Sequence, residues 1–213
     1  MKKLLVLAAI TVLPLTASAL SIRNTAHDLS SSSSATLKST DTDRVCVFCH
    51  IPHNAVTTKK ALWNRNDITD TGLAGWGTTT TLDGPTYVTD AIGAGSQACF
   101  SCHDGGVRVV EGVRRKPTTM VAAITVGATR ITDASAMAGN HPVSIPYAEQ
   151  SHLGVASQAT IEAVAAATTA GIELENNVGV ECTSCHQVHD NQLGSFLRVT
   201  TAGSALCFAC HNK

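Results

Sequence analysis

Aromatic residues are scarce in this chain of 213 residues, which has two tryptophans, two tyrosines and four phenylalanines. Large aromatic side chains normally fill much of a protein core, so the peptide alone would build only a thin one. Three of the four phenylalanines, Phe48, Phe100 and Phe208, also lie inside short cysteine-containing motifs. The sequence therefore indicates that something other than side chains fills the interior.

The chain also lacks a strong charge of either sign and, beyond its first residues, any long hydrophobic run. Its formal net charge is −1, which argues against the basic surface of a nucleic-acid-binding protein. Residues 1–19 combine Lys2 and Lys3, an apolar stretch and a small-residue end, the pattern of a cleaved signal peptide. We therefore expect an exported protein without an integral membrane segment, and an uncleaved anchor is the alternative.

No cysteine lies outside four C-x-x-C-H motifs, which occupy residues 46–50, 99–103, 182–186 and 207–211. Disulfides do not need a histidine after the second cysteine, and neither does a four-cysteine zinc site, although the spacing of the last two motifs is close to that of a zinc ribbon. C-x-x-C-H is the attachment signature of haem c, in which two thiols bind the haem and the histidine ligates its iron. The sequence thus predicts four haem c groups. The predicted attachment residues are Cys46, Cys49, Cys99, Cys102, Cys182, Cys185, Cys207 and Cys210.

Nine histidines are present, four of which end the motifs and are predicted to be proximal iron ligands. If each iron is closed by two histidines, four of the other five supply the distal ligands. His53 and His189 each lie three residues after a motif histidine. That spacing is too short to reach the far face of the same haem, so each is predicted to ligate an adjacent one.

The remaining distal ligands are predicted to be His141, held in a stiff context beside Pro142, and His27 in the N-terminal arm, while His152 is expected to be spare. The full predicted set of iron ligands is His27, His50, His53, His103, His141, His186, His189 and His211.

Four motifs in the 194 residues after the signal leave about 48 residues for each haem. At this ratio the haems themselves are the hydrophobic core. The predicted fold class is a multihaem cytochrome c, mostly irregular, with a few short helices wrapped around a chain of haems and little sheet. Residues 20–44 are expected to be an arm with a serine-rich linker, and 45–213 the tetrahaem domain.

Within that domain, Ser96 and Ser204 are predicted N-caps of helices at the second and fourth motifs. The longest helix is predicted over 157–171, strands over 107–113 and 119–126, and an irregular loop over 72–88.

Several stretches resemble tetrahaem cytochromes of the doubled C-x-x-C-H type. They are HDLS, CVFCHIPHN followed by ALWNR, NHPVSIPY, ECTSCHQVHD with FLR, and LCFACHNK. The pattern is most similar to extracellular cytochrome filaments of the outer-membrane cytochrome E type. The resemblance implies a protomer with four bis-histidine haems that stacks head to tail into a filament, in which one haem takes a histidine from the adjacent protomer. His27 is the expected donor of that histidine.

The predicted function is electron transfer without enzyme activity. The expected partners are further copies of the chain, other redox proteins and extracellular electron acceptors, and the expected location is an extracellular filament. A soluble periplasmic shuttle is the main alternative. A multihaem reductase with one open coordination position, and a membrane-anchored quinol oxidase with an uncleaved signal, are further alternatives.

Overall fold

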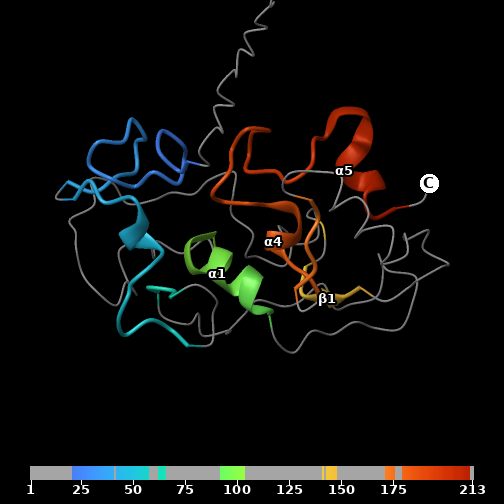
Figure 1. Cartoon of the computed structure of the whole chain (residues 1–213), viewed down its shortest axis with the longest axis horizontal. Helices are drawn as coiled ribbons and strands as arrows, with labels where there is room; N and C mark the ends of the chain where they lie inside the picture. Colours follow the sequence, from blue (N-terminus) through green and yellow to red (C-terminus); the bar gives the residue numbers. More distant parts are fainter. Residues whose placement is uncertain are drawn as a thin grey trace, which may run out of the picture.

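The computed structural model describes residues 21–40, 42–57, 62–65, 92–103, 141, 143–147, 171–175 and 179–211. Within these ranges the chain is mostly loop, with short elements in the following order: η1 (Cys46–Phe48), α1 (Ala94–His103), β1 (Ile145–Pro146), β2 (Gly179–Val180), α4 (Cys182–Cys185), η3 (Ala202–Ser204) and α5 (Ala205–Phe208). For these residues the prediction of an irregular chain with a few short helices and little sheet is confirmed. Figure 1 shows α1 near the middle, with the N-terminal segment on one side and α4 and α5 on the other.

Every C-x-x-C-H motif coincides with a turn of helix. In three motifs the backbone N–H of the histidine donates to the carbonyl of the first cysteine: His50 to Cys46 at 2.8 Å, His186 to Cys182 at 3.0 Å and His211 to Cys207 at 2.8 Å. The second motif forms the end of α1. Positions i, i+3 and i+4 share one face of a helix. The turn therefore brings both cysteines and the histidine of a motif to the same side.

Helices α1 and α4 pack together around a buried carboxylate. Glu181, which is 5% exposed and directly precedes α4, accepts hydrogen bonds from the hydroxyls of Ser96 and Ser144, the latter at 2.9 Å. Its side chain also accepts from the backbone N–H of Ser184, whose hydroxyl accepts from the N–H of Glu181 at 2.9 Å. The carboxylate thus joins the second motif to the start of the third.

The two predicted N-caps, Ser96 and Ser204, have different positions in the structure. Ser96 is not an N-cap, because α1 begins at Ala94 and Ser96 lies within its first turn. Its hydroxyl is used for the contact with Glu181 instead, so tertiary packing, and not helix capping, explains this serine. Ser204 does precede α5, but with a φ of 61° and no hydrogen bond from its side chain to the helix.

Strands β1 and β2 form a two-stranded sheet of two residue pairs beside the start of α4. Ile145 and Pro146 pair antiparallel with Val180 and Gly179, respectively. Next to it, Gly93 has no room for a side chain, since an added Cβ would lie 2.0 Å from an oxygen of Glu181. The backbone immediately before α1 therefore approaches the buried carboxylate directly.

Among the described residues, buried apolar side chains form two small clusters. Ile92, Phe100 and Val143 form one, against which Cys182 packs, whereas the other is built from Ile172, Val199 and Ala209.

The N-terminal segment is folded through its serines. Ser30, Ser33 and Ser39 are buried, and Asp28 accepts hydrogen bonds from the hydroxyl and the backbone N–H of Ser30 at 2.5 and 3.2 Å. Ser39 N–H donates to the carbonyl of Leu29 at 2.8 Å. The stretch for which a linker was expected is therefore a compact turn in this structure.

Other expectations concern parts of the chain outside the described residues. They include the signal peptide over 1–19, the loop over 72–88, the strands over 107–113 and 119–126, nearly all of the helix over 157–171, and His152. In the part of the chain that the structure describes, no helix has the length and apolar character needed to cross a membrane.

Candidate haem-binding sites

The eight cysteines are all described, and none is joined to another by a disulfide. Burial raises the pKa of Cys49 to about 12 and that of Cys210 to about 11, so both thiols are neutral. The pKa of Cys99 is raised by its hydrogen-bonding contact with Cys182 and by burial. Because these two are the first cysteines of the second and third motifs, the attachment points of those motifs lie side by side.

His186 shows how the fold orients a motif histidine. Its Nδ1 lies 2.9 Å from the carbonyl oxygen of Ser195. A carbonyl oxygen can only accept, so Nδ1 carries the proton and Nε2 keeps its lone pair. Metal-binding histidines are commonly fixed in this way by a hydrogen bond from the other ring nitrogen. The third motif therefore presents its histidine as a ligand with a defined tautomer.

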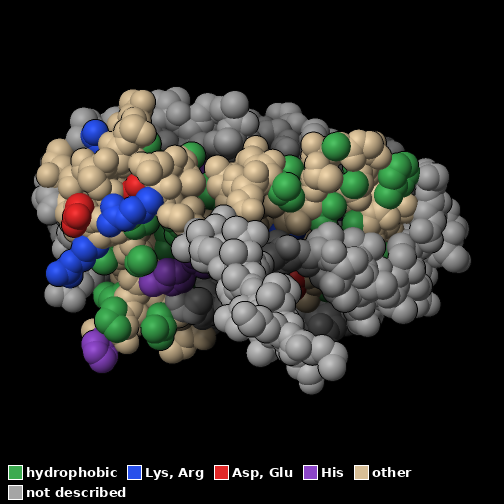
Figure 2. Space-filling model, turned by 45° about the horizontal axis from the view of Figure 1, so that its top comes forward, with side chains coloured by type: hydrophobic (Ala, Val, Ile, Leu, Met, Phe, Trp, Pro, Cys, Tyr) green, Lys and Arg blue, Asp and Glu red, His purple; other side chains and the backbone are tan. Residues whose placement is uncertain are grey.

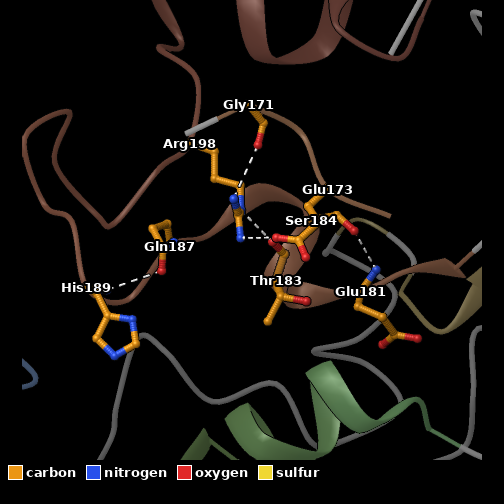
Figure 3. Close-up of polar contacts among 8 residues, drawn as sticks. All are labelled: Gly171, Glu173, Glu181, Thr183, Ser184, Gln187, His189 and Arg198. Carbon is orange, nitrogen blue, oxygen red and sulfur yellow. Dashed lines mark hydrogen bonds and ion pairs between the residues drawn. The ribbon is translucent and has the colours of Figure 1, made fainter. Parts of the chain in front are cut away.

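His50 of the first motif faces His189, which follows the third motif. Their ring centroids are 6.0 Å apart, and the ring planes differ by 16°. The backbone N–H of His189 donates to the side-chain oxygen of Gln187 at 3.5 Å (Figure 3). Burial, and next the charge of His50, lowers the pKa of His189. A neutral imidazole is the form that binds a metal.

His27 faces His103 of the second motif, with ring centroids 6.0 Å apart and an interplanar angle of 63°. The ring of Phe196 stacks on a face of the His27 ring, with centroids 4.4 Å apart and an interplanar angle of 9°. Burial, followed by the charges of His103 and His186, lowers the pKa of His27 to about 4. The N-terminal arm thus delivers a neutral imidazole to a motif of its own chain.

His141 faces His211 of the fourth motif, with ring centroids 6.3 Å apart and an angle of 61° between the planes. Nearby, the hydroxyl of Tyr147 donates to the carbonyl of Cys210 at 3.5 Å. The segment NHPVSIPY, singled out in the sequence for its rigid histidine, therefore lies against the last motif at both of its ends.

These separations fit a pair of axial ligands. Metal–imidazole bonds are about 2.0–2.1 Å long and the ring centre lies about 1.1 Å beyond the nitrogen, so two imidazoles on opposite sides of one metal have centres about 6 Å apart. The observed values are 6.0, 6.0 and 6.3 Å. Each pair contains one motif histidine and one of the predicted distal histidines, and the residues present therefore fit a haem closed from both faces.

His53 and His186 form no such pair within the described part of the chain. Both side chains are exposed. On the face drawn in Figure 2, histidine side chains reach the surface on the same side as a group of basic side chains. Of the two histidines that follow motifs, His189 lies beside the histidine of another motif, whereas His53 has no such neighbour among the described residues.

Two polar atoms beside the first motif are buried without a hydrogen-bond partner in the described structure, Trp63 Nε1 and Asn64 Oδ1. The Trp63 ring lies 6.1 Å from that of His50, edge to face. An indole N–H can only donate, and buried donors are nearly always satisfied. This donor is therefore available to an oxygen of a bound group, such as a haem propionate.

The comparison with protein families agrees with this geometry. Residues 176–213 match the model of the doubled CXXCH motif, a stretch that contains the third and fourth motifs. The match supports a c-type cytochrome. Covalently bound haem c is accordingly the cofactor that the motifs indicate, and multihaem electron transfer is the general function. No curated protein matches the chain.

Two arginines that hold the motifs were not identified as site residues from the sequence. Arg65, which is 3% exposed, donates from Nε and Nη2 to the carbonyl of Ser101 at 3.1 and 2.8 Å. Arg198 donates from Nε to the carbonyl of Thr183 at 2.7 Å and pairs with Glu173 at 2.8 Å (Figure 3). Ser101 and Thr183 lie between the cysteines of their motifs, so each arginine fixes one attachment turn.

The sequence signal for these arginines was the repeated ending of ALWNR and FLR after two of the motifs. The structure shows that these segments return in the same register, in which Arg198 corresponds to Asn64, so that Arg65 lies one residue beyond the equivalent position. Residues 62 and 64 bond to 51 and 49, and residues 196 and 198 bond to 187 and 185. His50 and His186 accordingly form bridges with Trp63 and Leu197. The first and third motifs are thus built on one repeated loop.

Proposed function

We propose that the chain carries electrons through four haem c groups, each closed by two histidines, and that it has no substrate site. The observation that carries this proposal is the spacing of three histidine pairs, with ring centroids 6.0 to 6.3 Å apart. Bound haem c supplies reversible one-electron transfer between ferric and ferrous iron. Closure by two histidines leaves no position for a substrate at the metal.

The ligand pairs also tie distant segments of the chain together. The pair His50–His189 links the first motif to the loop after the third, and His27–His103 links the N-terminal arm to the second. The two histidines of each pair would bind one iron from opposite sides. A pair such as His50–His189, whose members belong to segments that carry different haems, therefore brings those haems close together. Close spacing is what electron tunnelling requires, and the contact between Cys99 and Cys182 favours it for the second and third motifs.

We further assign the chain the role of the repeating subunit of an exported filament. The resemblance to extracellular cytochrome filaments motivates this role, and the exposed His53 and His186 support it. Since His27 lies beside a motif of its own chain, we assign the ligand supplied by a neighbouring copy to His53. It would ligate the iron held by His186 of the next copy. Other redox proteins or extracellular acceptors are the proposed partners at the filament ends.

The ligand assignment is tested on haem-loaded protein purified from an export-competent host. Haem content and electron paramagnetic resonance should give four low-spin haems per chain. Replacing His53 by alanine should convert one of them to a high-spin or carbon monoxide-binding state and abolish assembly. The matched replacement of His152, predicted to be spare, should leave both unchanged. If His152→Ala opened one haem and His53→Ala did not, the fourth distal ligand would be His152.

Assembly is tested by cryo-electron microscopy of haem-positive material sheared from cells that express the chain. Continuous filaments with an unbroken series of haems are expected. If only discrete particles with four low-spin haems were found, the chain would be a soluble periplasmic shuttle. A high-spin ferric haem in the unmodified resting protein would instead support the reductase alternative.

A further inference from the structure

We propose that the turn formed by Ser195 and Phe196 positions axial ligands of two different haems at once, His186 through the backbone and His27 through the aromatic ring. The proposal rests on the proposed bis-histidine ligation and adds a positioning residue, Phe196, that does not itself contact the metal.

The turn is rigidly built. Phe196 N–H donates to the side-chain oxygen of Asn191 at 2.9 Å, and its carbonyl accepts from the N–H of Gln187 at 2.7 Å. One residue later the chain is fixed again, where Leu197 N–H donates to the carbonyl of Gly194 at 3.0 Å. The backbone on both sides of the Ser195–Phe196 peptide is thus held in place.

The backbone conformation of the turn is unusual. Ser195 and Phe196 have φ values of 48° and 56°, in the left-handed region that bulky residues avoid. Such conformations persist where the surrounding contacts over-determine them, and they gather at functional sites. Here two consecutive residues adopt it, and each of them contacts a different histidine.

The first contact is made by the backbone. The carbonyl of Ser195 accepts the Nδ1 proton of His186 at 2.9 Å, which sets both the tautomer and the direction of Nε2. The left-handed conformation turns this carbonyl toward the motif, and the bridge between His186 and Leu197 holds the two strands of the loop together.

The second contact is made by the side chain of the next residue. Phe196 is 9% exposed, and its ring stacks on that of His27 at 4.4 Å and 9°. The ring centroids of His27 and His103 are 6.0 Å apart. Phe196 therefore packs on a face of the arm imidazole and holds the plane of that ring, while the ring edge that carries the nitrogens stays available to a metal. Because Ser195 and Phe196 share one peptide bond, a shift of the turn moves both ligands together.

The test uses carbon monoxide binding by the reduced, haem-loaded protein, since ferrous haem with two firmly held histidines does not take up the gas. Phe196→Ala should allow carbon monoxide to bind to one haem per chain, the same haem that is opened by His27→Ala. The double variant should bind no more than either single one. Leu193→Ala, which removes an apolar side chain from the same loop at a position 52% exposed, should bind none.

A second variant distinguishes positioning from folding. Phe196→Tyr keeps the flat ring and should restore the closed haem with full haem content. Asn191→Ala removes the acceptor that holds Phe196 N–H and should disturb the low-spin signals of two haems, those of His27 and His186. Should Phe196→Ala fail to load haem, Phe196→Leu, which keeps apolar volume but loses the stack, is judged by the same criterion.

The proposal is overturned if Phe196→Ala or Phe196→Leu behaves like Leu193→Ala, or if Asn191→Ala leaves the spectrum of the His186 haem unchanged. Failure of the underlying function has a different signature, because the unmodified protein would then hold fewer than four haems or bind carbon monoxide itself.

Discussion

Replacing Glu181 by alanine should destabilise the haem-loaded protein, because this one carboxylate joins the second and third motifs. The substitution removes the acceptor for the hydroxyls of Ser96 and Ser144 and for the backbone N–H of Ser184. Ser96 is fully buried, so its hydroxyl loses a partner that water cannot replace.

The magnitude follows from these contacts. A hydrogen bond to a charged group contributes about 1.5–3 kcal/mol, and a buried donor left without a partner costs a similar amount. Burial of the charge, which raises the pKa of Glu181, offsets part of this gain. We therefore expect Glu181→Ala to lower the free energy of unfolding by about 2–4 kcal/mol.

The matched control is Glu173→Ala. Glu173 is also a hydrogen-bonded carboxylate, paired with the buried Arg198 at 2.8 Å, but its own side chain is 61% exposed. Water can therefore replace it beside the guanidinium, which keeps its bond to the carbonyl of Thr183, and we expect a loss of about 0–1 kcal/mol. Guanidinium unfolding at pH 7, followed by circular dichroism, compares the two variants through the transition midpoint at unchanged slope. The double variant with Ser96→Ala should lose less than the sum of the single losses, because the stranded hydroxyl is then absent.

The reasoning would be refuted if Glu181→Ala were no more destabilised than Glu173→Ala. It would equally be refuted by additive losses in the double variant, since Ser96 and Glu181 would then not depend on each other.

Three further outcomes are expected. Burial raises the pKa of Glu181 above its ordinary value of 4.5, so the native state binds the carboxyl proton more firmly than the unfolded state does. The free energy of unfolding of the wild type, measured relative to that of Glu181→Gln, should therefore fall as the pH rises above 4.5. A difference that does not change with pH would contradict this sign. Replacing Asn64, whose Nδ2 donates to the carbonyl of Val47 at 2.5 Å, by alanine should cost about 1–3 kcal/mol in denaturant unfolding, and a loss within error of zero would show that the first motif does not need this clamp. His189→Ala should open the haem attached at the first motif, detected as carbon monoxide bound to one haem per chain, whereas binding at any other haem would disprove its pairing with His50.

Much of the attachment chemistry could be predicted from the sequence, because it is encoded within five consecutive residues. In C-x-x-C-H the spacing itself places two thiols and an imidazole on one helical turn, and the turns at His50, His186 and His211 are each closed by a backbone hydrogen bond within the motif. The irregular character of the rest was also predictable, from the few aromatic residues and the frequent turn-forming residues.

The partners of the motif histidines could not be predicted in the same way. The serine-rich stretch next to His27 is typical of a linker and left open whether this histidine folds back onto its own chain or reaches a neighbouring one. The resemblance to cytochrome filaments favoured the neighbouring chain. In the structure those serines are buried around Asp28, and the His27 ring stacks on Phe196 and lies beside His103 of its own chain. Ser96 was expected to cap a helix, because serine is common at N-caps. In the structure its hydroxyl donates to the carboxylate of Glu181, 85 residues away along the chain.

The side chains that can bind haem c are evident from the sequence, since covalent attachment and proximal ligation are local properties of the motif. The folded chain was needed to show which distal histidine lies beside which motif and which arginine fixes which turn. A distal ligand must approach from the opposite side of the haem and therefore comes from elsewhere in the chain. Its position depends on how loops such as that of Ser195 and Phe196 return, and such returns leave no periodic pattern in the sequence.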